Sequence, residues 1–183
     1  MIESFIISVK ILKMEKVINE VLNVFKKIKK EEFEEFEKVI LKSKKIFVFG
    51  TGRSGFIGRC FCMRLFHLGF DSYFVGEIIT PAFTEEDLII FISGTGEKSI
   101  VLQIAKICRK EKGRILTITA NKKSKLSKIS DYLIYIPVEN SIQFGNSLFE
   151  QVCFLFLDSF IQFYIEKHRI NEDLMKKRHT NLE

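Results

Sequence analysis

The stretch Asp87–Ser99 reads DLIIFISGTGEKS, and the rest of the chain is organised around it. Its apolar run Leu88–Ile92 is typical of a strand that is buried on both faces. The turn Ser93–Gly96 leads into a helical pattern over Lys98–Arg109. Glycines let backbone N–H groups approach a ligand, and a helix N-terminus carries partial positive charge. The stretch therefore predicts a phosphate site, although turns rich in Ser and Thr also occur as plain helix caps.

A second glycine turn follows the apolar strand Lys45–Phe49 and reads GTGRSG over Gly50–Gly55. A helix is expected over Phe56–Leu68, ended by Gly69. The turn matches G-x-G-x-x-G, and Glu77 lies at about the distance at which a dinucleotide-binding fold places its ribose-binding acid. A nicotinamide cofactor is therefore an alternative, but that interpretation gives no role to the Ser93–Gly96 turn or to the C-terminal stretch Arg178–Glu183.

Further strands are expected at Ser72–Val75, Arg114–Thr119 and Tyr132–Ile136, with a short helix near Ser124–Ile129. Strands that alternate with helices predict the α/β class: a five-stranded parallel sheet with helices on both faces, a flavodoxin-like three-layer sandwich. Ligands bind such sheets outside the carboxyl ends of the strands, where the winding reverses. Both glycine turns lie at that edge and should face one another across a crevice.

Helical segments flank this pattern. The first block, Met1–Lys44, contains no Gly or Pro and predicts two helices separated at Lys26–Lys30. The long segment Ser147–His168 is apolar around most of its circumference, so we expect other elements and a second copy of the chain to cover it. The polar tail shows no structural period. One domain is expected, with N-terminal helices over 1–44, an α/β core over 45–168 and a tail over 169–183.

Length, charge and cysteine content narrow the possible classes. With 183 residues and 46% hydrophobic content, the chain suits one domain with a sizeable core. The formal charge of +6 is spread over short clusters without a nucleic-acid reading element, so no nucleic-acid partner is expected. Four cysteines lack metal-site spacing and predict reduced thiols and no metal. We see no signal peptide and no run long enough to span a bilayer, which predicts a cytoplasmic protein without a membrane partner.

Several short motifs share one resemblance. They are FVFGTGRSGFIGR at Phe47–Arg59, SYFVGE at Ser72–Glu77, TP at Thr80–Pro81, ISGTGE at Ile92–Glu97, GNSLFEQ at Gly145–Gln151 and RHTNLE at Arg178–Glu183. Together they resemble the sugar isomerase (SIS) domain family. The pair formed by GRSG and the terminal RHTNLE is narrower and is similar to the 6-phospho-3-hexuloisomerases. This resemblance extends from Phe47 to the C-terminus.

The resemblance implies an activity and a phosphate site. The activity is conversion of D-arabino-hex-3-ulose 6-phosphate to fructose 6-phosphate through a cis-enediolate, the second step of formaldehyde fixation by the ribulose monophosphate route, without a cofactor. The family usually has Thr where this chain has Lys98, so the Lys98 ammonium or the Ser99 hydroxyl should replace that contact. The other implied substrate contacts are Ser54 in the GTGRSG turn and the turn that follows Leu88–Ile92, with Ser93, Gly94, Thr95, Gly96 and Glu97.

Candidate catalytic residues lie near the C-terminus. Glu150 is the candidate base, because it stands in the first turn of the apolar helix. An alternative for Glu150 is structural: Ser147-x-x-Glu150 has the spacing of a capping box. His179, in the RHTNLE motif, is the candidate proton shuttle or electrophile, in its own or a neighbouring subunit. A folded-back tail would then complete the site.

Four further residues have weaker or structural assignments. Arg53 could neutralise a phosphate or an enediolate, or form a surface salt bridge. Glu77 is a weaker rival base. His67 and His168 are assigned to structure.

Two other functions remain open at this point. One is another phosphosugar isomerase of the same fold, and the other is a non-catalytic sugar-phosphate sensor. A DNA-binding regulator would need a helix-turn-helix domain, for which the 44 N-terminal residues are too few and lack the turn signature. In either case, we expect a homo-oligomer, a dimer or a tetramer.

Overall fold

The computed structural model describes residues 2–182, and the side chains of residues 12–182. The expected strands and helices are present, most of them within a few residues of their predicted bounds. In chain order they are α1 Ile2–Phe25, α2 Glu31–Leu41, β1 Ile46–Gly50, α3 Arg53–Leu68, β2 Ser72–Phe74, β3 Leu88–Ile92, α4 Ser99–Lys110, β4 Arg114–Thr119, α5 Lys125–Ile129, β5 Tyr132–Tyr135, α6 Ser147–His168 and α7 Glu172–Arg178.

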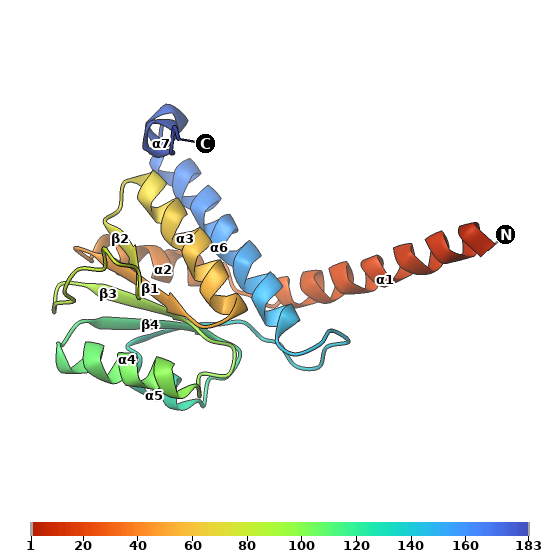
Figure 1. The fold of residues 1–183 in the computed structure, drawn as a ribbon, viewed down its shortest axis with the longest axis horizontal. Coiled ribbons are helices and arrows are strands. Elements are labelled where there is room, and N and C mark those ends of the chain that lie inside the picture. Colours follow the sequence, from red (N-terminus) through yellow and green to blue (C-terminus); the bar gives the residue numbers. More distant parts are fainter. Residues whose placement is uncertain (1, 183) are drawn as a thin grey trace.

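The five strands form one parallel sheet in the order β2-β1-β3-β4-β5. The winding reverses between β1 and β3, which pair from Ile46 with Leu88 to Gly50 with Ile92. The carboxyl ends of these two strands therefore lie side by side, and a glycine turn follows each. In Figure 1, α3 and α6 cover one face of the sheet and α4 and α5 the other, as expected for a three-layer sandwich.

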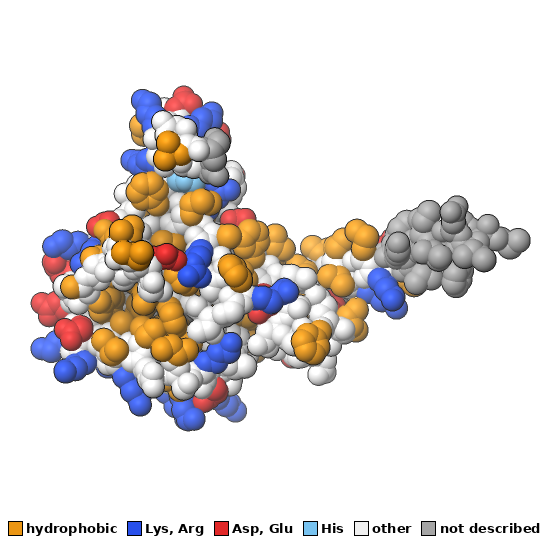
Figure 2. Space-filling view, in the orientation of Figure 1, with side chains coloured by type: hydrophobic (Ala, Val, Ile, Leu, Met, Phe, Trp, Pro, Cys, Tyr) orange, Lys and Arg blue, Asp and Glu red, His pale blue; other side chains and the backbone are white. Residues whose placement is uncertain are grey.

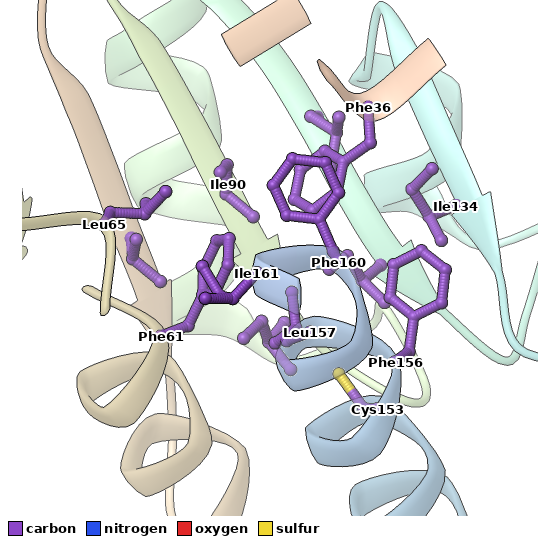
Figure 3. Packing of buried hydrophobic residues seen from close by; sticks show 14 of the residues in the cluster. Phe36, Phe61, Leu65, Ile90, Ile134, Cys153, Phe156, Leu157, Phe160 and Ile161 are labelled. Carbon is purple, nitrogen blue, oxygen red and sulfur yellow. The ribbon is translucent and has the colours of Figure 1, made fainter. Parts of the chain in front are cut away.

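Alternate side chains of the central strands supply two separate cores. Ile46 and Val48 of β1 join the core under α2, α3 and α6, whereas Phe47 and Phe49 join the core under α4 and α5. The first core is rich in phenylalanine (Figure 3), and Phe160 of α6 is fully buried in it. Burial on both faces explains why these strands read as unbroken apolar runs.

Helix α6 corrects one expectation from the sequence. By length and composition, Ser147–His168 is long and apolar enough to cross a membrane, although no such run was expected. In the structure, Val152, Phe156, Phe160 and other residues of α6 are buried against the sheet and the neighbouring helices. The apolar character of this helix therefore fits a role as the central helix of the core.

Two other differences concern helix bounds. Helix α3 begins at Arg53 rather than at Phe56, so Arg53 and Ser54 lie in its first turn. The tail, which shows no period in the sequence, contains helix α7. The Asn171 side chain caps α7 by accepting a hydrogen bond from the Asp173 N–H at 2.8 Å. A polar helix of about two turns has too few apolar positions to reveal its period.

Helix α1 extends from the body as an arm (Figure 1). Its C-terminal part packs on α6, where Val24 is buried. Leu12, Met14, Ile18 and Leu22 expose about half of their surface or more. Figure 2 shows hydrophobic side chains along this arm and on the adjoining body. An exposed apolar stripe of this kind is typical of a surface that another protein chain covers.

Candidate functional site

Three segments meet at the carboxyl edge of the sheet: the turns after β1 and β3, and the first turn of α6. The Lys98 ammonium donates a hydrogen bond to the Thr51 hydroxyl at 3.0 Å and so joins the two glycine turns. An added Cβ at Gly94 would lie 3.0 Å from the Phe149 ring, which shows that the β3 turn packs directly on α6. The two turns therefore lie side by side at this edge of the sheet, and we call the surface between them the crevice.

The Gly50–Gly55 turn depends on close contact between backbone atoms. A Cβ at Gly50 would lie 2.8 Å from the Ser54 carbonyl oxygen, and one at Gly55 would lie 2.7 Å from the Gly50 carbonyl oxygen. Gly52 has φ +58°, a backbone conformation that residues other than glycine rarely adopt. These glycines bring the first turn of α3, with Arg53 and the buried Ser54, against the end of β1.

The Ser93–Gly96 turn is stabilised by a hydrogen bond within the turn. The buried Ser93 hydroxyl accepts a hydrogen bond from the Gly96 N–H at 3.2 Å. Gly96 has φ +64°, and a Cβ there would lie 2.2 Å from the Ser124 hydroxyl oxygen. Thr95, Lys98 and Ser99 are exposed at the rim of the crevice. Because the first N–H groups of α4 lack partners within the helix, this rim offers donors to an anion.

The residues that support this turn escaped the sequence reasoning. Thr119 donates a hydrogen bond to the Gly94 carbonyl at 3.1 Å, and the Asn121 side chain donates to the Thr95 carbonyl at 3.4 Å. Thr119 is the last residue of β4 and Asn121 follows it, and the carboxyl end of β4 lies at the same edge of the sheet. The rule that places ligands at this edge could have identified them.

The Glu97 side chain points away from the crevice. Its carboxylate accepts a hydrogen bond from the Lys125 N–H at 2.8 Å and pairs with the Lys125 ammonium at 3.2 Å. These contacts hold the pKa of Glu97 below its ordinary value. Among the described residues, the Glu97 side chain therefore stabilises the start of α5, and only the Glu97 backbone lies at the Ser93–Gly96 turn.

Glu150 pairs with Arg53 instead of capping its helix. The Arg53 Nε donates to the Glu150 carboxylate, which is 12% exposed. The Ser147 hydroxyl donates to the Phe144 carbonyl at 2.9 Å, so the two side chains do not combine into the capping box that the spacing suggested. Arg53 and Glu150 line an open pocket of about 300 Å³ together with Phe56, Ile57, Gln151 and Phe154.

The structure does not bring His179 to Glu150 within one chain. Arg178 donates to the His67 carbonyl at 3.2 Å and so docks the tail at the C-terminal end of α3. The His179 and His67 rings lie there with their centroids 5.1 Å apart. Since α3 has 16 residues, its two ends are about 24 Å apart. Arg53 and Glu150 lie at the other end (Figure 1).

The tail contact predicts a pH-dependent stability. Burial lowers the pKa of His67, and the nearby His179 and Arg64 lower it further. The unfolded chain then binds more protons below about pH 6.5 than the folded chain, so we expect the free energy of unfolding to fall as the pH drops through that range. Urea unfolding at pH 8 and pH 5.5 measures this effect.

His67→Gln should reduce that pH dependence, and His179→Gln should reduce it less, because it removes only one neighbouring charge. A pH dependence unchanged in His67→Gln would show that other groups cause it.

The remaining candidates have structural contacts. Glu77 pairs with Arg59 at 2.9 Å beside a different pocket, between α3 and β2. His168 lies 2.6 Å from the Glu37 carboxylate and stacks on Tyr164, in line with its structural assignment.

Cys62, Cys108 and Cys153 are buried, and Cys60 is exposed. In the described part of the chain, no group of three or more His, Cys, Asp or Glu side chains is placed to hold a metal ion.

Taken together, this geometry defines an α/β protein with two glycine turns at the switch point of a parallel sheet and an open pocket lined by Arg53 and Glu150 beside them. The family model of the SIS domain matches residues 39–155. The chain belongs to the SIS domain family, and the resemblance seen in its motifs is confirmed.

The chain is also similar to two named relatives and to one solved structure. A protein of Methanocaldococcus jannaschii named 3-hexulose-6-phosphate isomerase is 43% identical over 145 residues, which cover 78% of this chain and 79% of the relative. One of Bacillus subtilis with the same name is 36% identical over 176 residues, which cover 91% and 95%. A crystal structure of a Methanococcus jannaschii protein, described as inferring a molecular function of 3-hexulose-6-phosphate isomerase, has a TM-score of 0.86 and 38% identity. It covers 93% of this chain and 99% of that chain.

Proposed function

We propose that this protein is a 6-phospho-3-hexuloisomerase, which interconverts D-arabino-hex-3-ulose 6-phosphate and fructose 6-phosphate. The observation that carries the proposal is the pocket beside the two glycine turns, where Arg53 pairs with the sheltered carboxylate of Glu150. The similarity to two proteins named 3-hexulose-6-phosphate isomerase supports this substrate. We place the enzyme in the cytoplasm, in the route that fixes formaldehyde through ribulose monophosphate.

The chemistry needs few groups. A base removes the proton from C2, which leaves a cis-enediolate across C2 and C3. A proton then passes from O2 to O3, and the base returns a proton to C3. Because O6 carries the phosphate, the 3-ketose cannot close a five-membered ring through it, and no group is needed to open a ring on the 3-ketose side. One base and one donor for the enediolate oxygens suffice.

We assign these roles to residues of the site. Glu150 is the base, since its carboxylate faces a pocket and is partly sheltered from water. Arg53 orients that carboxylate and can donate to the enediolate. Ser54 binds phosphate or sugar hydroxyl groups. The phosphate binds the backbone over Gly94–Glu97 and the hydroxyls of Ser93, Thr95 and Ser99.

The Lys98 ammonium already spans the crevice and should bind the phosphate directly. Lys98→Met is expected to raise KM about ten- to a hundredfold with a smaller change in kcat, because a hydrogen bond to a charged group contributes about 1.5–3 kcal/mol. Lys106→Met, which removes an exposed charge from the same helix, is the control. A KM equal to that of the wild type would place the Lys98 charge outside the phosphate site.

We infer that the active form is a homo-oligomer in which the tail of a neighbouring subunit supplies His179. Phe56 and Phe154 remain 68% and 37% exposed beside the Glu150 pocket. Next to them, α1 and α6 form an apolar groove of about 420 Å³. Light scattering at micromolar concentration should give a dimeric or tetrameric mass, and a monomeric mass would count against this inference.

A coupled assay for fructose 6-phosphate tests the function. A synthase generates the 3-ketose phosphate in place from formaldehyde and ribulose 5-phosphate, and product formation is followed with and without this protein. Turnover with this substrate, and much less with arabinose 5-phosphate or sedoheptulose 7-phosphate, is the expected result. Binding of sugar phosphate without turnover would favour a sensor.

A further inference from the structure

We propose that Glu20 of α1 is a positioning residue, which holds the loop over 139–146 and, through it, the first turn of α6 with Glu150. The positioning role rests on the proposed function. The clamp itself is a property of the fold that can be measured separately.

The Glu20 carboxylate contacts three consecutive residues of this loop. One oxygen accepts a hydrogen bond from the Ile142 N–H at 2.8 Å. The other accepts from the Ser141 hydroxyl at 3.1 Å and from the Gln143 side-chain amide at 3.2 Å. Burial acts to raise the pKa of Glu20, but these hydrogen bonds together hold it below its ordinary value. The carboxylate is therefore charged at neutral pH, and charge-assisted hydrogen bonds are the stronger kind.

Little else holds the loop in place. Ile142 and Phe144 expose 67% and 96% of their surface, so apolar burial contributes little. Lys27 and Glu139 approach to 3.8 Å, but both are more than half exposed and such a pair contributes little. Gly145 has φ +63°, a turn that glycine adopts freely. The Glu20 hydrogen bonds are thus the main fixed contacts described for this segment.

The loop is joined directly to the start of α6. The Ser147 hydroxyl donates to the Phe144 carbonyl at 2.9 Å, and the Glu150 N–H donates to the Asn146 carbonyl at 3.0 Å. Further along α6, Phe156 and Phe160 anchor the helix in the core without help from the loop. Leu148 and Phe149 on the inner side of the first turn are buried as well. Loss of Glu20 should therefore leave the fold intact, loosen the loop and shift the outer side of the first turn, which carries Glu150.

The test combines kinetics with hydrogen exchange in the full chain. The variants are Glu20→Ala and Glu20→Gln, with Glu15→Gln as the control, because it removes the same charge from an exposed position on the same helix. In Glu20→Ala, we expect faster amide exchange over 139–146 and a kcat about ten- to a hundredfold lower, since misplaced catalytic groups cost rate steeply. KM should change much less, because the phosphate contacts lie on other loops.

Glu20→Gln keeps one acceptor oxygen and should rescue part of both losses. Glu15→Gln should match the wild type in exchange and in kcat. Unchanged exchange in Glu20→Ala would overturn the clamp, and faster exchange with unchanged kcat would overturn the positioning role. Absence of turnover in the wild type would overturn the proposed function and the positioning role with it, while the exchange result would still decide the clamp.

Discussion

Replacing Glu150 by Gln is expected to lower kcat about 10²- to 10⁴-fold, the usual contribution of a positioned general base. An amide has nearly the shape of the carboxylate, and its oxygen can still accept the Arg53 hydrogen bond. It cannot take the proton from C2. KM should change little, because the phosphate contacts lie on the two glycine turns. The coupled fructose 6-phosphate assay measures both constants.

Glu166→Gln is the matched control for this change. Glu166 lies near the other end of α6, is exposed, and accepts a hydrogen bond from the Gln162 side chain at 3.0 Å. This variant should turn over substrate like the wild type. If Glu150→Gln does so too, the Arg53–Glu150 pair is structural, and His179 becomes the leading candidate base.

Replacing Phe160 by Ala is expected to reduce the free energy of unfolding by about 3–5 kcal/mol. The Phe160 side chain is fully buried, and its ring centroid lies 4.5 Å from that of Phe36 and 6.3 Å from that of Phe61 (Figure 3). Removing the ring leaves a cavity between α2, α3 and α6. Since folded domains are typically stable by about 5–15 kcal/mol, this is a large fraction of the total.

Urea unfolding measures the effect, with Phe66→Ala as the control. The Phe66 side chain is 52% exposed on α3, so its removal should have a much smaller effect. Equal losses in both variants would show that α6 does not act as the central helix of the core.

The sequence predicts the sheet well because its strands are buried on both faces. Leu88–Ile92 and Arg114–Thr119 were located to the residue, since short runs rich in Ile, Leu and Thr flanked by glycine or polar turns leave little freedom. The reversal of winding between β1 and β3 followed from the two glycine turns. Helix α7 was missed, because it depends on the Asn171 cap and on the docking of Arg178 rather than on an apolar face.

The candidate site was predictable only in part, because its residues come from distant segments. Spacing alone left Glu150 between a base and a capping box, and the Arg53 contact that excludes the box joins residues 97 positions apart. The Lys98 contact with Thr51 and the clamp by Glu20 are also long-range. No local pattern contains such pairs, whereas the glycine turns, which are local, were identified from the sequence.

In the two glycine turns, main-chain atoms and exposed side chains have different roles, and this difference affects how substrate preference can change during evolution. The turns keep their shape through main-chain atoms, as the mutual contact of Gly50 and Gly55 and the support of the Gly94 carbonyl by Thr119 show. The side chains of Thr95, Lys98 and Ser99 are exposed, and of these three only Lys98 joins the two turns. Substitutions at these positions can therefore tune how tightly a phosphosugar is held, while the main-chain framework and the stability of the fold are retained.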